Sequence, residues 1–136
     1  MELKLIKTLW GVPTAGDTSN WDNLFKEIKN DGFSGIESIG LTWKMNPVLF
    51  KELLNKYDLS LVIQIHTAGG YIENNEYIYC CSNKIDIHVK SFRQQLIEAL
   101  EMGAVMINSH SGHDSWDINT AISYFEQTLQ IEHDLI

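Results

Sequence analysis

Histidines follow two of the apolar runs in this sequence. His66 comes directly after the apolar run 59–65, and His110 and His113 follow the run 104–108. Imidazole binds divalent metals and exchanges protons near neutral pH. These residues could therefore hold a metal ion or move protons on a polar substrate. Two structural alternatives stay open, because His66 could be a hydrogen-bonded core residue and His113 a solvated loop residue.

An aromatic ring and a carboxylate occupy similar places earlier in the chain. Trp10 ends the first apolar run, and Glu37 lies within the second. A tryptophan ring can form a wall for a sugar ring, and a carboxylate can bind a metal or a hydroxyl. The alternatives are that Trp10 packs against its neighbours and that Glu37 pairs with a lysine.

Strands and helices that alternate along the chain must position these groups. Short apolar runs predict strands, and apolar residues at helical spacing predict helices. The regular alternation of predicted strands and helices indicates right-handed βαβ units, which form a parallel sheet. These units make up a single α/β domain over residues 1–136. The carboxyl ends of such strands meet at one edge, where the candidate side chains would converge. We expect strands at 3–10, 35–39, 59–65 and 104–108. We expect a first helix that is capped at Asp17, Thr18 or Ser19 and stops at 31–32, and further helices from 47, at 87–102 and from 118.

Three details of this pattern are specific enough to test. The polar and aromatic segment 71–83 predicts a loop, with a short helix as the alternative. His88 and His133 fall within predicted helices and are expected at the surface. For the last helix, the spacing of apolar residues predicts a core-facing stripe, formed by Ile118, Ile122, Phe125 and Leu129.

Composition disfavours several classes of partner and location. The net charge is −8, with 10 basic and 18 acidic residues. Basic residues are scattered, so the stripe that binds nucleic acid phosphates is not evident. No apolar run reaches the roughly 20 residues that cross a membrane, and no signal peptide is evident, so a cytoplasmic location is expected. The adjacent Cys80 and Cys81 are expected to be reduced thiols.

Three segments, taken in order, resemble the xylose-isomerase-like TIM barrels, a superfamily of sugar phosphate isomerases and epimerases that includes endonuclease-IV-like enzymes. They are Asp31–Glu37 (DGFSGIE), Gln64–Thr67 (QIHT) and Ile107–Gly112 (INSHSG). The resemblance covers essentially the whole chain in order. It implies the first four β/α units, the N-terminal half of a barrel that usually needs about 250 residues.

The resemblance also implies an activity and a cofactor. Members bind Mn, Mg, Co or Zn, and they move a proton beside the carbonyl of a sugar or sugar phosphate while the metal stabilises the enediolate. His66 and His110 would be catalytic residues and metal ligands, and Trp10, Glu37 and His113 would bind substrate. The principal metal ligands come from strands five to eight, so the ligand set would be incomplete and the isolated chain is expected to be inactive.

Two other functions stay open from the sequence. One is a zinc phosphoesterase that acts at abasic sites in DNA, which suits the histidine pair but not the acidic composition. The other is a non-catalytic half-barrel that acts as an assembly module. The half-barrel itself has three explanations: a fragment, a homo-oligomer whose copies cover the open sheet edges, or a sheet flattened into a three-layer sandwich.

Overall fold

The computed structural model describes residues 3–67, 71–73, 76–78, 83–110 and 112–136. The chain divides into two compact units. Residues 1–64 and 99–108 form the first unit, and residues 65–98 and 109–136 form the second. Cys80 and Cys81, which we predicted to be reduced thiols, lie outside the described residues.

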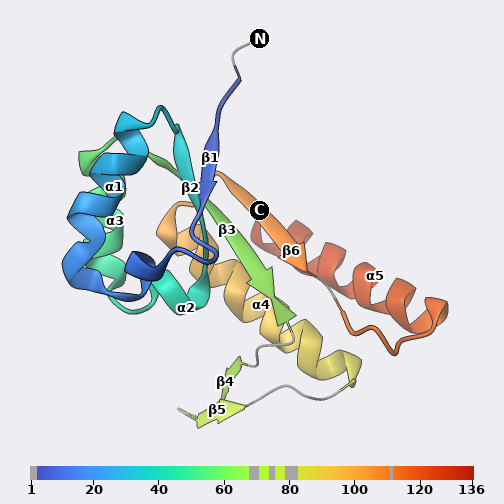
Figure 1. The fold of residues 1–136 in the computed structure, drawn as a ribbon. Coiled ribbons are helices and arrows are strands. Elements are labelled where there is room, and N and C mark those ends of the chain that lie inside the picture. The colour runs from blue at the N-terminus through green and yellow to red at the C-terminus, as the bar shows by residue number, and fades with distance from the viewer. Residues whose placement is uncertain (1–2, 68–70, 74–75, 79–82, 111) are drawn as a thin grey trace. The chain divides into compact units, whose positions relative to one another are not determined.

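Strands and helices alternate along most of the chain (Figure 1). Short 3-10 helices at Pro13–Gly16 and Thr18–Asn20 precede the first α-helix. The elements are β1 (Ile6–Thr8), α1 (Trp21–Asn30), β2 (Gly35–Ile39), α2 (Gly40–Trp43), α3 (Pro47–Lys56), β3 (Ser60–His66), β4 (Tyr71–Glu73), β5 (Glu76–Ile78), α4 (Ile85–Met102), β6 (Met106–His110) and α5 (Ile118–Leu135).

A four-stranded sheet with the strand order β1-β2-β3-β6 is the centre of the first unit. Strands β1 and β2 pair in parallel with Thr8 opposite Glu37, and β2 and β3 pair in parallel from Gly35↔Ser60 to Ile39↔Gln64. The Val105 amide donates to the Leu61 carbonyl at 2.8 Å on the other side of β3. The predicted α/β fold with a parallel sheet is confirmed. The last residues of β3 and β6 belong to the second unit.

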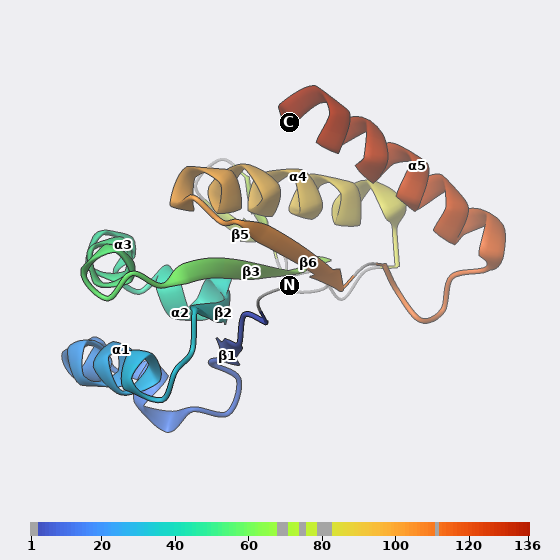
Figure 2. The same ribbon diagram turned by 90° about the horizontal axis from the view of Figure 1, so that it is seen from above.

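Aromatic side chains join α1 and α3, which lie side by side next to the sheet of the first unit (Figures 1 and 2). Phe50 of α3 makes edge-to-face contacts with Trp21 at 5.2 Å and with Phe25 at 5.1 Å between ring centroids. All three rings are completely buried. Such contacts contribute beyond the burial of apolar area, so this cluster fixes the helix pair.

The start of α3 follows from its sequence. Asn46 is the N-cap, and its side-chain oxygen accepts a hydrogen bond from the Leu49 amide at 3.1 Å. Pro47 occupies the first turn, where its missing N–H costs no helical hydrogen bond. The predicted start of this helix at Asn46 and Pro47 is therefore confirmed.

The second unit contains α5 and most of α4, together with a two-stranded antiparallel hairpin. In the hairpin, Tyr71 pairs with Ile78 and Glu73 pairs with Glu76. The prediction of a loop or short helix in the segment 71–83 was therefore wrong for the residues of β4 and β5. Each strand has three residues, which is too short to produce the alternation that identifies a strand in a sequence.

Helix α5 buries a different stripe from the one that its sequence predicted. The buried residues are Tyr124, Thr128 and Ile131. The predicted core-facing residues are exposed instead, by 71% at Ile118, 48% at Ile122, 55% at Phe125 and 56% at Leu129. Two apolar stripes lie next to each other on this helix, and hydrophobic spacing cannot say which one the tertiary structure covers.

In the part of the chain that the structure describes, no helix combines the length and the apolar character that a membrane crossing requires.

Candidate active site

The structure brings His66 and His110 together in the second unit. His66 is the last residue of β3, His110 is the last residue of β6, and the two strands are neighbours in the sheet. Their imidazole rings stack with 4.5 Å between centroids and 17° between planes. His66 is half-buried and His110 is exposed. The prediction that strand-end histidines meet is correct for this pair.

The stacked arrangement affects the protonation of His66. Burial of the ring lowers the pKa of His66 below its ordinary value of 6.5, and a positive charge on His110 lowers this pKa further. Both causes disfavour the charged form of the imidazole. His66 is therefore held as a neutral imidazole at neutral pH, the form that accepts a proton or ligates a metal.

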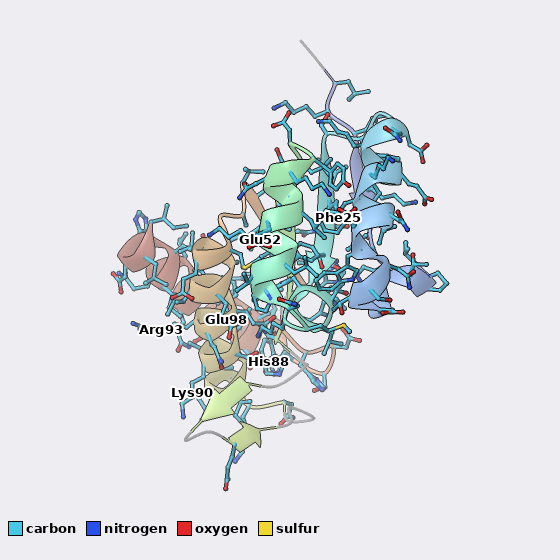
Figure 3. The ribbon with its side chains drawn as sticks, turned by 90° about the vertical axis from the view of Figure 1, so that its left-hand side faces the viewer. Phe25, Glu52, His88, Lys90, Arg93 and Glu98 are labelled. Carbon is cyan, nitrogen blue, oxygen red and sulfur yellow. The ribbon has the colours of Figure 1, made fainter. Side chains whose placement is uncertain are left out.

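Helix α4 presents polar side chains to the end of β3. Gln95 hydrogen-bonds the backbone of His66, and the Nδ1 atom of His88 lies 2.9 Å from the Thr67 hydroxyl. His88 and Thr67 are completely buried. Figure 3 shows His88 on the opposite side of α4 from Lys90 and Arg93, which are both exposed.

The burial of His88 corrects the prediction that it is a surface residue. Two aromatic rings surround it, with centroid distances of 4.9 Å to Trp116 and 6.4 Å to Tyr124. The sequence offered one signal, since the spacing of His88, Ser91 and Gln95 places them on one face of a helix. His133, the other histidine expected at the surface, is exposed on α5.

The hydrogen bonds of the His113 ring involve Ser115 and not the stacked pair. Its Nδ1 atom accepts a hydrogen bond from the Ser115 amide at 3.1 Å and lies 2.8 Å from the Ser115 hydroxyl. Its ring centroid is 6.2 Å from that of His88. These contacts give His113 a local role in ordering the loop before α5, and its predicted role in substrate binding stays a prediction.

Trp10 and Glu37 belong to the first unit. The Trp10 indole nitrogen donates a 2.6 Å hydrogen bond to the Gln64 side-chain oxygen, and 56% of Trp10 is exposed. Glu37 is half-buried between its pairing partners Thr8 and Val62. Successive side chains of a strand point to opposite faces, so Glu37 points away from the face of the buried Ile36.

Gln64 is a residue of this region that reasoning from the sequence missed. It is buried and polar within an otherwise apolar strand. Residues two apart on a strand share a face, so Gln64 lies on the face of Val62, the pairing partner of Glu37. A buried polar residue in an apolar run was the signal that could have found it.

A pocket of about 200 Å³ opens beside Trp10 in the first unit. Leu9, Val12, Ile39 and Thr42 line it together with Trp10. These residues come from the segments that follow β1 and from the junction of β2 and α2. The carboxyl ends of parallel strands are where ligands bind in α/β folds, so the pocket has the expected place for a small ligand group.

The residues that the structure describes do not form a complete metal site. No group of three or more His, Cys, Asp or Glu side chains among them could hold an ion. A catalytic zinc site has at least three protein ligands. The lone pairs of imidazole lie in the ring plane, so two stacked, nearly parallel rings keep them in separate planes and do not direct them onto one point. The metal role of His66 and His110 stays a prediction.

Solved structures match the fold of this chain, but its sequence matches no family model and no curated protein. Among solved structures, a sugar phosphate isomerase/epimerase from Parabacteroides distasonis superimposes with a TM-score of 0.65 at 9% identity. An AP endonuclease of family 2 from Brucella melitensis superimposes with a TM-score of 0.62 at 13% identity.

The matched regions cover nearly all of this chain. They comprise 98% of it and 51% of the isomerase/epimerase, and 97% of it and 50% of the endonuclease. The chain thus spans about half the length of the structures that it matches. At these identities the match shows the fold alone, which is parallel strands alternating with helices as in half of a TIM barrel, and this is the fold that the sequence predicted. That this half is the N-terminal one stays a prediction.

Proposed function

We propose that this chain supplies part of the active site of a sugar or sugar phosphate isomerase or epimerase. The observation that carries the proposal is the stacked His66–His110 pair at the ends of neighbouring strands. The resemblance in fold to a sugar phosphate isomerase/epimerase supports it. The carboxyl-end position is where α/β barrels hold their reacting groups.

The pair suits proton transfer beside a carbonyl. Such a reaction needs a base that removes a proton and an acid that protonates oxygen. A positive charge on one of two stacked imidazoles disfavours a positive charge on the other, so the pair resists carrying a proton on both rings. With its lowered pKa, His66 is the proposed proton acceptor, and the exposed His110 is its neighbour in the stack.

A divalent metal is part of the proposal as a partner of the complete active site. Because the stacked rings do not direct their lone pairs onto one point, only one of His66 and His110 would ligate the ion in this arrangement, and the further donors have to come from elsewhere. Trp10, with its indole fixed by Gln64, and the carboxylate of Glu37 are the proposed substrate contacts in the first unit.

Turnover of aldose/ketose pairs tests this proposal. The protein purified from its source cells is assayed with a coupled enzyme system, with and without Mn²⁺. We expect metal-dependent interconversion of at least one pair and its loss in His66→Gln. If no sugar or sugar phosphate turns over under either condition, the proposal is wrong.

A second candidate is a phosphoesterase that cleaves abasic sites. The fold match to an AP endonuclease and the histidine pair favour it. The net charge of −8 counts against it, since binding to DNA depends on neutralising phosphates. Cleavage of a duplex with one abasic site, absent with the intact duplex, would favour this candidate over the isomerase.

A further inference from the structure

The side chain of Gln95 makes a two-point contact with the backbone of His66. The Gln95 amide nitrogen donates to the His66 carbonyl at 2.9 Å, and the Gln95 amide oxygen accepts from the His66 N–H at 3.3 Å. A carboxamide has a donor and an acceptor in one plane, as a peptide group does. The Gln95 carboxamide therefore hydrogen-bonds both the N–H and the carbonyl of His66, as the backbone of a neighbouring strand would.

The position of His66 explains why such a contact is needed. The register between β2 and β3 ends at Ile39↔Gln64, so His66 lies two residues beyond the last of these pairs. A half-buried strand backbone that extends past its pairing partner needs other hydrogen-bond partners on that side. Gln95 supplies both of them from α4.

Neighbouring residues on α4 hold Gln95 and the end of β3 in place. The Gln95 amide nitrogen also lies 2.9 Å from the hydroxyl of Ser91, which is completely buried. One turn earlier, His88 contacts the Thr67 hydroxyl at 2.9 Å. His66, the last residue of β3, and Thr67, which follows it, thus both contact side chains on one face of α4.

We propose that Gln95 is a positioning residue that fixes the backbone of His66 and thereby holds its imidazole in the stack with His110. The relevance of Gln95 to catalysis rests on the proposed function. The positioning of the His66 ring by Gln95 does not depend on that function. Without the two hydrogen bonds, the end of β3 gains freedom and the ring loses its fixed direction.

Gln95→Leu removes both hydrogen bonds at similar side-chain volume. The matched control is Gln94→Leu on the same helix, because the Gln94 side chain donates a hydrogen bond to Glu98 at 3.1 Å. Nuclear Overhauser effects between the ring protons of His66 and His110 report the stack in the 136-residue chain. We expect these effects in wild type and in Gln94→Leu, and their loss in Gln95→Leu with an unchanged circular dichroism spectrum.

Retention of the ring-to-ring effects in a folded Gln95→Leu variant would overturn the proposal. If that variant does not fold, Gln95→Glu decides the question. Its carboxylate keeps an acceptor for the His66 N–H but loses the donor to the His66 carbonyl. We expect weakened ring-to-ring effects in Gln95→Glu, and wild-type intensities would contradict the positioning role.

A binding measurement separates this inference from the proposed function. Fructose 6-phosphate serves as the probe in calorimetric titrations of wild type, Gln95→Leu and Gln94→Leu. We expect Gln95→Leu to bind at least about fivefold more weakly, the effect of losing one ordinary hydrogen bond, and Gln94→Leu to bind as wild type. No binding to wild type counts against the proposed function, while the ring-to-ring effects still decide the role of Gln95.

Discussion

The stacking of His66 on His110 couples the protonation of the two rings. Removal of His110 takes away the charge that lowers the pKa of His66, and it leaves burial, the larger cause, largely in place. We therefore expect His110→Gln to raise the pKa of His66 part of the way toward its ordinary value. NMR titration of the imidazole protons measures the change.

The control for this titration is His133→Gln on α5, since His133 is exposed. It should leave the His66 titration unchanged. A His66 pKa that stays the same, or falls, in His110→Gln would show that the two rings are not coupled.

The lowered pKa of His66 also predicts how stability depends on pH. The folded chain binds a proton at His66 less tightly than the unfolded chain does, so between the lower folded pKa and the ordinary value the unfolded chain carries more protons. The free energy of unfolding should therefore fall as the pH is lowered through this window. His66→Gln removes this contribution.

Urea unfolding at about pH 8 and about pH 5.5, which bracket the ordinary histidine range, measures the effect. The loss of stability between these pH values should be smaller in His66→Gln than in wild type or in His133→Gln. An equal loss in all three proteins would mean that His66 does not contribute.

Reasoning from the sequence found the two histidines but not the residues that hold them. His66 and His110 were found because they follow apolar runs, a signal that depends on the local sequence. His88 was placed at the surface because a polar residue on a helix is usually exposed. Its burial depends on Thr67 and on aromatic rings from distant segments, which the local sequence does not show.

The close approach of strands β2 and β3 depends on Gly35, which has no side chain. A Cβ atom built at this position would lie 2.6 Å from the Ser60 carbonyl oxygen and 2.8 Å from the Ile6 side chain. The Ser60 carbonyl is backbone, so the strands themselves would have to move apart. We expect Gly35→Ala to lower the free energy of unfolding by about 1–3 kcal/mol, the usual cost of overpacking.

Gly16→Ala is the matched control, because a Cβ there meets nothing within 4 Å and its backbone is not left-handed. Urea unfolding monitored by tryptophan fluorescence compares the two variants. Equal stability in Gly35→Ala and Gly16→Ala would contradict the observed spacing of β2 and β3.

Elements with strong local signals were predicted well. The strand 35–39 was predicted with its observed bounds, and the helix that begins at Pro47 has both a cap and a proline at its start. The strand predicted at 104–108 lies two residues later, at Met106–His110. The short helix Gly40–Trp43 was missed, because four residues give no periodicity to read.

At the scale of the whole molecule, the first unit leaves apolar side chains exposed on both outer strands of its sheet. Leu5 is 48% exposed next to β1, and on the β6 side Val105 is 69% and Met106 63% exposed. Outer strands of a sheet present free hydrogen-bonding groups that invite pairing. We therefore propose that a second copy of the chain covers these edges.

Met106→Lys should disrupt such an assembly, because lysine on an outer strand opposes pairing. Size-exclusion chromatography with light scattering should show a smaller species for this variant than for wild type. The control is Leu41→Lys, at a residue that is 81% exposed and belongs to α2 and not to an outer strand. A wild-type chain that is monomeric at all concentrations would contradict the assembly.

If the stacked pair belongs to a sugar-binding site, His66 and His110 should respond together to a sugar phosphate. The 136-residue chain is titrated with fructose 6-phosphate while the imidazole signals of its histidines are followed by NMR. We expect saturable shifts of His66 and His110 with one dissociation constant, and no shift of the exposed His133. Unchanged His66 and His110 signals, or equal shifts at His133, would contradict the claim that the stacked pair is part of a sugar-binding site.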